Sequence, residues 1–311
     1  MKAEDIKTKA DVDKWLAALP PPLRERGCQI IAYRHSLRFL PFLMEYANQD
    51  ATKRDRHTHS VLLVFRVILL FLAHLRSEGP KPKLGLDDKV SENLNKALAR
   101  TNPSGDAPKR AARLVIRSVW LSTNTLQTVN DTHSTHIRKQ AVQAVETGEA
   151  LASSTGVTVN AANRKTINAV KYDAEIFEKS DDALASPLWP DGAEPLAANW
   201  LNARALFDAH PAWAVFRDFY ERSVSGDPQD WQLLTDLGCE PDDFWTGTDE
   251  EVLDRIAEVV VSMVDATVKT PSDRNSVSVR QDKANLKISR ELADAIAEAQ
   301  KLKQGLDLAR V

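Results

Sequence analysis

The feature that most constrains the fold is a proline-free segment between Pro108 and Ser180, in which small or apolar side chains return every three to four residues. This spacing places them on one side of a helix. The stripe consists of Ile137, Ala141, Ala144, Gly148, Leu151, Val159, Ala162, Thr166, Val170 and Phe177. A single helix of this length would reach about 100 Å. Because Ser153 to Gly156 resembles a turn, we expect an antiparallel hairpin of two long helices, with one elongated helix as the alternative.

Helical spacing of apolar residues also covers the first 100 residues. The predicted helices are Lys9–Leu19, Leu23–Ala47, Thr58–Arg76 and Asp87–Arg100. The first stops at Pro20, and Pro41 should kink the second. The third contains the most hydrophobic run, Val61–Leu75. We interpret it as a buried helix, because it is short for a bilayer span and contains Arg66 and His74.

Five of the seven tryptophans fall in one segment of 57 residues. This segment holds ten of the twenty aromatic residues: Trp189, Trp200, Phe207, Trp213, Phe216, Phe219, Tyr220, Trp231, Phe244 and Trp245. Helices are predicted near residues 195–209, 211–224, 228–237 and 249–268. So dense an aromatic cluster indicates either a packed core or a groove that grips a partner.

After Pro271 the pattern changes to period two in Ser276–Val279 and Leu286–Ser289, which predicts a short β-hairpin. An amphipathic helix is predicted to follow over Arg290–Lys303. The sequence therefore predicts an all-α protein. It would be an elongated helical bundle with a long helical hairpin, a small Trp-rich helical domain and a short C-terminal β-hairpin.

The charges are distributed unevenly along the chain. Residues 1–120 contain 22 Lys and Arg against 13 Asp and Glu, whereas residues 181–270 contain 5 against 19. Opposite charge favours docking of one part on the other, or head-to-tail association of copies. Two solvated surfaces that do not contact each other would give the same charge counts. The predicted parts are a basic helical domain (1–105), a hairpin or coiled-coil-like segment (106–180), an acidic Trp-rich domain (186–270) and a tail (271–311).

Histidine pairs are the first candidates for metal or acid–base chemistry. His57 and His59 form one pair, and His133 and His136 form another. Together they could offer four nitrogen ligands to zinc, but such short spacings arise readily by chance. The chain also lacks a nucleophile elbow, a dinucleotide fingerprint and a phosphate loop. We therefore predict no catalytic residue, no cofactor and no metal site.

Cysteine usage and the first residues suggest where the chain works. Cys28 and Cys239 lie far apart without companions, which excludes a disulfide framework and suits a reducing cytoplasm. The stretch from Met1 to Asp13 alternates charges and has no apolar run, so a secretory signal is not expected. The predicted location is cytoplasmic, with no membrane partner.

Arginines and lysines suggest a nucleic-acid surface. The candidates are Arg34, Arg38, Lys53, Arg54, Arg56, Arg113 and Arg117. Arg113 and Arg117 stand four apart, hence on one helical face, and could follow phosphates. Against this reading, the isoelectric point is about 6.2 and no helix-turn-helix motif is recognised. The same residues could instead dock the acidic domain.

Six aromatic residues are the candidates for binding a protein partner: Trp189, Trp200, Trp213, Phe216, Tyr220 and Trp245. Trp213, Phe216 and Tyr220 share one helical face, and Trp200 and Phe207 make a matching pair on the preceding helix. Two such faces can interdigitate, so a buried core is the alternative to a groove.

A longer pattern runs through the same segment. It comprises Leu188-Trp189-Pro190, Trp200, Trp213-x-x-Phe216-x-x-Phe219-Tyr220, Gly226 and Phe244-Trp245-x-Gly247. This pattern resembles one in an uncharacterised family of bacterial helical proteins, whose members more often have Trp at positions 216 and 219. The resemblance covers residues 186–256 best. It implies a shared helical fold and no known activity.

The predicted function is a non-catalytic intracellular interaction or scaffold protein. It would self-associate through the long helices as a homo-oligomer and bind an unidentified protein partner through the aromatic domain. The alternative is a nucleic-acid-binding regulatory protein that uses the N-terminal arginines. A metal-dependent or other enzyme ranks third.

Overall fold

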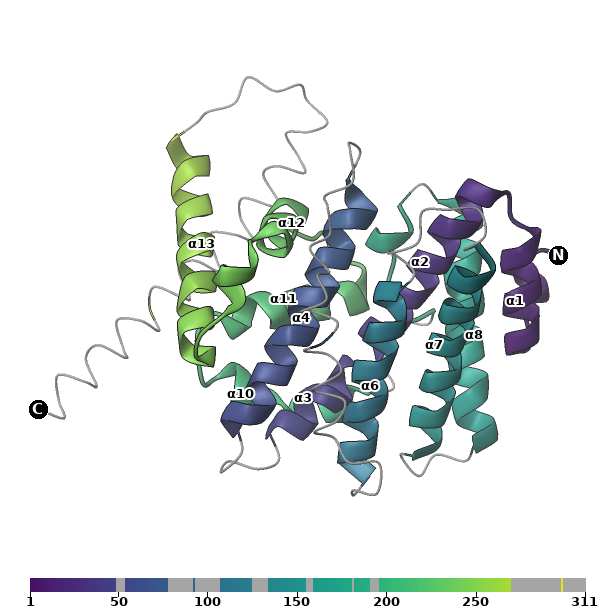
Figure 1. Cartoon of the computed structure of the whole chain (residues 1–311), viewed down its shortest axis with the longest axis horizontal. Helices are drawn as coiled ribbons and strands as arrows, with labels where there is room; N and C mark the ends of the chain where they lie inside the picture. Colours follow the sequence, from purple (N-terminus) through teal and green to yellow (C-terminus); the bar gives the residue numbers. More distant parts are fainter. Residues whose placement is uncertain are drawn as a thin grey trace, which may run out of the picture.

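The computed structural model describes residues 1–48, 54–77, 107–124, 134–154, 159–180, 182–190 and 196–269, with the single residues 92 and 298. Of the residues in these ranges 83% are helical and none is in a strand (Figure 1), which confirms the all-α prediction. The elements are η1 (Ala3–Asp5), α1 (Lys9–Ala18), α2 (Pro21–Arg38), α3 (Leu40–Asn48), α4 (Arg54–Arg76), α6 (Ala107–Asn124), α7 (Ser134–Ser154), α8 (Val159–Lys179), η4 (Ala183–Ala185), α9 (Ala197–Asn202), α10 (Arg204–Phe207), α11 (Trp213–Ser225), α12 (Trp231–Cys239), η5 (Asp242–Trp245) and α13 (Asp249–Lys269). The helix predicted over residues 87–100, the hairpin over 276–289 and the helix over 290–303 lie outside the described ranges.

Local capping sets the first helix. The Thr8 hydroxyl accepts a hydrogen bond from the Asp11 N–H, and the Asp11 carboxylate accepts one from the Thr8 N–H, which is a capping box. The helix ends at Ala18, ahead of Pro20, as the sequence predicts. Pro21 then occupies the first position of α2, where its missing N–H is not needed.

The predicted helix Leu23–Ala47 is two helices rather than one kinked helix. α2 ends at Arg38, Phe39 leaves helical geometry with ψ 0°, and α3 starts at Leu40. The reason is Pro41, which has no N–H and whose ring would clash with the carbonyl four residues earlier. Placing Pro41 in the first turn of a new helix removes both problems.

The described residues of the proline-free segment form the helices α6, α7 and α8. α7 and α8 form the expected antiparallel hairpin and lie side by side (Figure 1), with α7 ending at Ser154 inside the predicted turn. The apolar stripe packs against other helices of the same chain. Its members Ile137, Ala141 and Val170 lie in one buried cluster with Trp15 of α1 and Ile31 of α2.

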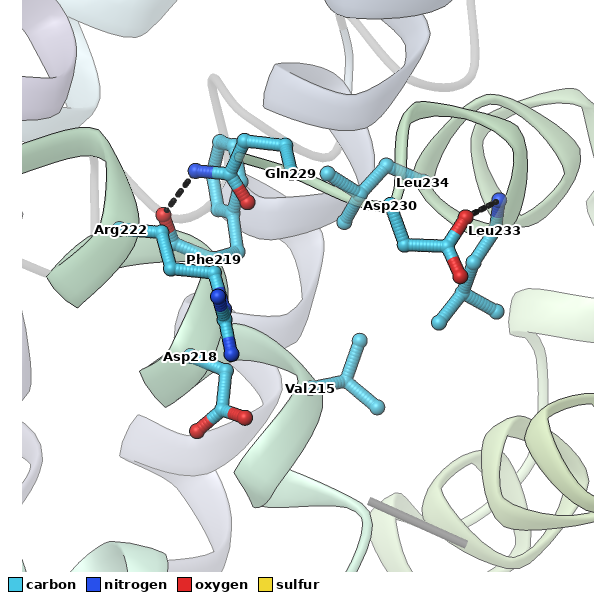
Figure 2. A pocket seen from close by; sticks show the side chains of 8 residues that line it. All are labelled: Val215, Asp218, Phe219, Arg222, Gln229, Asp230, Leu233 and Leu234. Carbon is cyan, nitrogen blue, oxygen red and sulfur yellow. Dashed lines mark hydrogen bonds between the residues drawn. The ribbon is translucent and has the colours of Figure 1, made fainter. Parts of the chain in front are cut away.

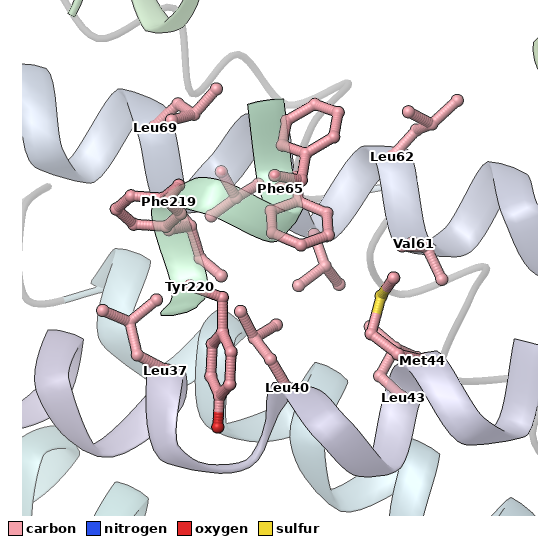
Figure 3. Close-up of a cluster of buried hydrophobic side chains, with 14 of the residues drawn as sticks. Leu37, Leu40, Leu43, Met44, Val61, Leu62, Phe65, Leu69, Phe219 and Tyr220 are labelled. Atoms are coloured by element: carbon pink, nitrogen blue, oxygen red, sulfur yellow. The ribbon is translucent and has the colours of Figure 1, made fainter. Parts of the chain in front are cut away.

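A second and larger buried cluster joins the basic front half to the aromatic segment. Phe65 of α4 stacks on Phe216 of α11 with ring centroids 4.3 Å apart, and it lies 6.3 Å from the ring of Trp213. Figure 3 shows Tyr220 of α11 between Leu37 and Leu40. The cluster thus crosses the boundaries predicted at residues 105 and 186.

α4 is the central helix of that cluster, with α3, α6, α12 and α13 packed around it. By length and composition, Thr58–Arg76 could cross a bilayer; its mean hydropathy is 1.9. However, 89% of this window is buried within the protein. The other helices therefore cover it, which agrees with the interpretation of a buried helix.

α12 crosses α4 at Gly238, where the two backbones approach closely. A Cβ atom on Gly238 would lie 2.5 Å from the Leu69 carbonyl oxygen and 2.7 Å from its carbon. Backbone atoms cannot move aside as a flexible side chain can. A residue without a side chain is therefore required for this crossing.

Gly238→Ala should lower the free energy of unfolding by about 1–3 kcal/mol, although alanine is favoured over glycine in a helix by roughly 1 kcal/mol. Urea unfolding followed by circular dichroism measures the change. Gln232→Ala, on an exposed position of the same helix, is the control and should stay within about 0.5 kcal/mol of the parent. A Gly238→Ala protein as stable as the parent would contradict the close crossing.

Candidate functional site

Asp173 of α8 lies between two arginines of α2. Its Oδ1 accepts hydrogen bonds from Arg34 Nε and Arg38 Nη2, each at 2.6 Å, and its Oδ2 accepts one from Arg38 Nη1 at 2.5 Å. None of the three side chains is more than 2% exposed. The other guanidinium N–H groups donate to backbone carbonyls of Ala169, Ala183, Ser186, Pro187 and Leu188. The cluster thus fastens α2 to α8 and to the segment after η4.

The charges of this cluster support one another. Burial alone would raise the pKa of the Asp173 carboxyl, but the two guanidinium groups overcome this and hold the pKa below its usual value. Burial lowers the pKa of Arg38, and Asp173 opposes that shift. Two guanidinium cations face one carboxylate. The backbone carbonyl oxygens that accept their other N–H groups therefore stabilise the positive charge that Asp173 does not neutralise. Arg38 also lies 5.3 Å from the ring centroid of Trp189.

This arrangement changes the nucleic-acid reading. Arg34 and Arg38 are enclosed and committed to Asp173, so phosphates cannot reach them. Lys53 lies outside the described residues, and Arg54 and Arg56 belong to the first turn of α4, where side chains are not described. Of the seven candidates, only Arg113 and Arg117 of α6 have described side chains that reach the surface; Arg117 is exposed and Arg113 half-buried.

The six aromatic candidates are all buried. Trp213, Phe216 and Tyr220 are at most 1% exposed, and Trp189, Trp200 and Trp245 are 6–7% exposed. Trp200 packs on Phe207 at 4.8 Å and on Tyr220 at 4.1 Å between ring centroids, which is the interdigitation expected of a core. Five of these rings therefore fill the interior, and the sixth, Trp245, also borders a hollow described below.

The glycine of the aromatic pattern has a structural reason. Gly226 ends α11 in the left-handed conformation with φ 76°, which favours glycine. A Cβ atom there would lie 2.7 Å from the ring of Pro187. Leu188 donates its N–H to the Ser223 carbonyl at 2.8 Å. The pattern from Leu188 to Gly226 thus records how the segment after η4 packs on the end of α11.

The histidine pairs do not form a metal site in the described part of the chain, where no three His, Cys, Asp or Glu side chains gather. His59 lies 3.3 Å from Asp249 Oδ1. His136 of α7 lies 3.1 Å from the side-chain amide nitrogen of Gln140. The side chains of His57 and His133 are outside the description. Both cysteines are free, Cys28 buried and Cys239 exposed.

A small hollow lies between α11 and the start of α12, and its polar residues are engaged in intramolecular hydrogen bonds (Figure 2). Gln229 donates its side-chain amide to the Phe219 carbonyl at 2.9 Å, and Asp230 caps α12 by accepting from the Leu233 N–H at 3.0 Å. The volume of about 20 Å³ is room for one water molecule. This hollow is therefore a packing feature of the turn.

Two larger hollows lie on α4, one on each side of the crossing with α12. The first, of about 230 Å³, is bordered by Arg66 of α4 and Trp245 of η5. The second, of about 350 Å³, is bordered by Arg76 and by Trp231 of α12. In each, a guanidinium lies near an indole, 5.8 Å from the ring centroid for Arg66 and 4.2 Å for Arg76.

Each arginine of these pairs also has a carboxylate partner. Arg66 is paired with Asp242, and Arg76 with Asp182 at 3.1 Å. Both pairs join residues 1–120 to residues 181–270, which is one of the arrangements that the charge distribution left open. Sequence reasoning did not choose Arg66, Arg76 or Trp231 as site residues. The available signal was a charged residue, Arg66, within the most apolar helix.

Comparison with protein-family models, with curated proteins and with solved structures finds no match to this chain. The resemblance of the aromatic segment to a bacterial helical family therefore stays a prediction. What the site can do has to be argued from its own geometry.

Asp173→Asn should lower the free energy of unfolding by about 3–5 kcal/mol, because it leaves two buried guanidinium groups without a counter-charge. Urea unfolding at neutral pH measures this. Glu146→Gln makes the same chemical change in the exposed Lys9–Glu146 pair, whose side chains are 50% and 44% exposed. It should lose less than about 1 kcal/mol. Equal losses would show that the buried cluster does not hold the fold.

The buried histidine His35 should make stability depend on pH. Burial lowers its pKa from 6.5 to about 3. Below pH 6.5 the unfolded chain binds a proton that the folded chain does not take up until about pH 3, so the free energy of unfolding falls as the pH falls through this window. The expected loss is roughly 2 kcal/mol between pH 6.5 and about pH 5.

His35→Leu removes this titration and should flatten the dependence between the two pH values. Urea unfolding of both proteins at each pH measures the difference. Both proteins share every other titrating group, so a parallel decline in the two would show that His35 is not responsible.

Proposed function

We propose that this chain is a non-catalytic protein-interaction or scaffold protein that binds its partner through the face made by α4, α12 and α13. The observation that carries the proposal is the pair of hollows on α4, each bordered by an arginine and a tryptophan. Trp and Arg are the residue types most enriched among those that dominate binding energy at protein interfaces.

The electrostatics of the two hollows suit burial under a partner. Each guanidinium already has a carboxylate, Asp242 or Asp182, so covering it does not strand an unpaired charge. Trp231 and Arg76 are only partly buried and offer the partner an indole and the edge of a guanidinium. Trp245 sits deeper and forms a wall of the other hollow.

The remaining parts of the earlier prediction rank below this one. Self-association through the long helices gains no support, because the described stripe of α7 and α8 is covered by α1 and α2 of the same chain. A second copy of the chain is therefore one candidate partner for the α4–α12–α13 face. Nucleic-acid binding would depend on Arg113 and Arg117, without Arg34 and Arg38. The two free cysteines suit a reducing compartment such as the cytoplasm.

Trp231→Ala should weaken partner binding by tenfold or more, about the loss expected for a tryptophan at the centre of an interface. Two measurements on the full chain test this. Sedimentation over a range of concentrations reports association of copies, and quantitative co-purification from the native host reports other partners.

Trp120→Ala is the matched control, because Trp120 is a half-buried tryptophan on α6 and lies outside the proposed face. It should leave association and the set of co-purified proteins unchanged, once circular dichroism has shown that both variants fold. If the two variants lose the same partners to the same extent, the α4–α12–α13 face is not the binding surface.

A further inference from the structure

The hollow beside Arg66 and Trp245 is lined by both apolar and polar side chains. Leu62 and Leu63 of α4 and Val252 of α13 form apolar walls, and the indole of Trp245 adds a flat aromatic surface. The polar side chains of the lining are His59, Arg66, Asp242 and Thr246. The volume of about 230 Å³ is large enough for a small organic group rather than for a single water molecule.

Two buried N–H groups of residues that line this hollow have no hydrogen-bond partner among the described residues. Arg66 uses Nη2 for Asp242, but its Nε has no acceptor. The indole Nε1 of Trp245 also has none. Both residues are buried, each with 7% of its surface exposed. Buried donors are almost always satisfied in proteins, so two such groups beside one hollow indicate a missing acceptor.

The surrounding charges decide which acceptor fits. The positive charge of Arg66 is already neutralised by Asp242. A second carboxylate, that of Asp249, lies beside His59, another residue of the lining. A further anion would be repelled by these carboxylates, and a cation would not accept hydrogen bonds from the two N–H groups. The acceptor that remains is an uncharged oxygen, and a carbonyl oxygen, which has two lone pairs and no N–H or O–H of its own, suits two donors best.

We propose that this hollow binds an uncharged amide group carried on an apolar or aromatic body. The amide oxygen accepts from the Trp245 indole and from Arg66 Nε, and the apolar body contacts Leu62, Leu63 and Val252. The proposal rests on the proposed function only for the origin of the amide group. A protein partner would supply this group from its peptide backbone or from an Asn or Gln side chain. The binding chemistry itself belongs to this chain alone.

Four small probes with the same ring test the hollow in the full chain. Benzamide carries an uncharged amide, benzoate an anion, benzylammonium a cation, and toluene no strong acceptor. Nuclear magnetic resonance of the ¹⁵N-labelled protein follows the Trp245 indole N–H and the Arg66 Nε–H. We expect benzamide to move both protons to lower field, and to bind about tenfold more tightly than toluene or either charged probe.

Trp245→Phe assigns the indole signal and removes one donor while keeping an aromatic ring. It should weaken benzamide binding by about fivefold to tenfold and leave toluene binding unchanged. The indole signals of Trp231 and Trp120 are internal controls in the parent protein and should not move with benzamide. The comparison of probes in the parent protein keeps the test valid if the variant does not fold.

Several outcomes would overturn the proposal. Toluene or benzoate binding as tightly as benzamide would show that the two donors do not select the ligand. So would a benzamide-induced shift confined to Trp231, or no shift with any probe. These results are separate from the fate of the proposed function, because the effect of Trp231→Ala on partner binding is measured at the other hollow. If benzamide binds as expected but Trp231→Ala does not change partner binding, the hollow is a small-molecule site and the proposed interaction face is wrong.

Discussion

The structure depends most on the placement of one carboxylate, Asp173, between Arg34 and Arg38. This ion cluster is fully enclosed, and its guanidinium groups also hold the carbonyls of the segment after η4. It therefore fixes α8 on α2 and sets where the chain enters the aromatic segment. A buried cluster of this kind adds little net stability compared with apolar residues of the same shape, but removing one member is severely destabilising. Its contribution is therefore to specify which elements meet.

From that anchor the aromatic helices are brought onto α4. Leu188 and Pro187, fastened by the arginines, contact the end of α11, and α11 presents Phe216 to Phe65. The basic and acidic parts of the chain thus share one core, and their remaining opposite charges meet at its edge as Arg66 with Asp242. The hollows left on both sides of the α12 crossing combine indole, guanidinium and carboxylate groups. This composition suits a surface that binds by contact and selective hydrogen bonding.

Sequence reasoning predicted the helices well where the signals are local. Pro20 and the apolar periodicity over 249–268 are local signals, so the bounds of α1 and α13 were predicted to within about one residue. The α2–α3 break was expected as a kink, because the response to Pro41 depends on what packs around it. The candidate site was predicted less well. Aromatic residues at helical spacing are equally suited to a core and to a groove, and here they form the core.

The sequence by itself determined that the chain is helical, that α4 is buried and that the two halves carry opposite charge, because periodicity and composition depend only on neighbouring residues. The tertiary structure alone decided which charges are hidden. Nothing near Arg34 or Arg38 in the sequence indicates that a carboxylate 135 residues or more away neutralises them. In the same way, the hollow whose two N–H groups lack a partner among the described residues arises only where α4, η5 and α13 meet. A pocket forms between elements that are far apart in the sequence, so the pattern of neighbouring residues does not predict it.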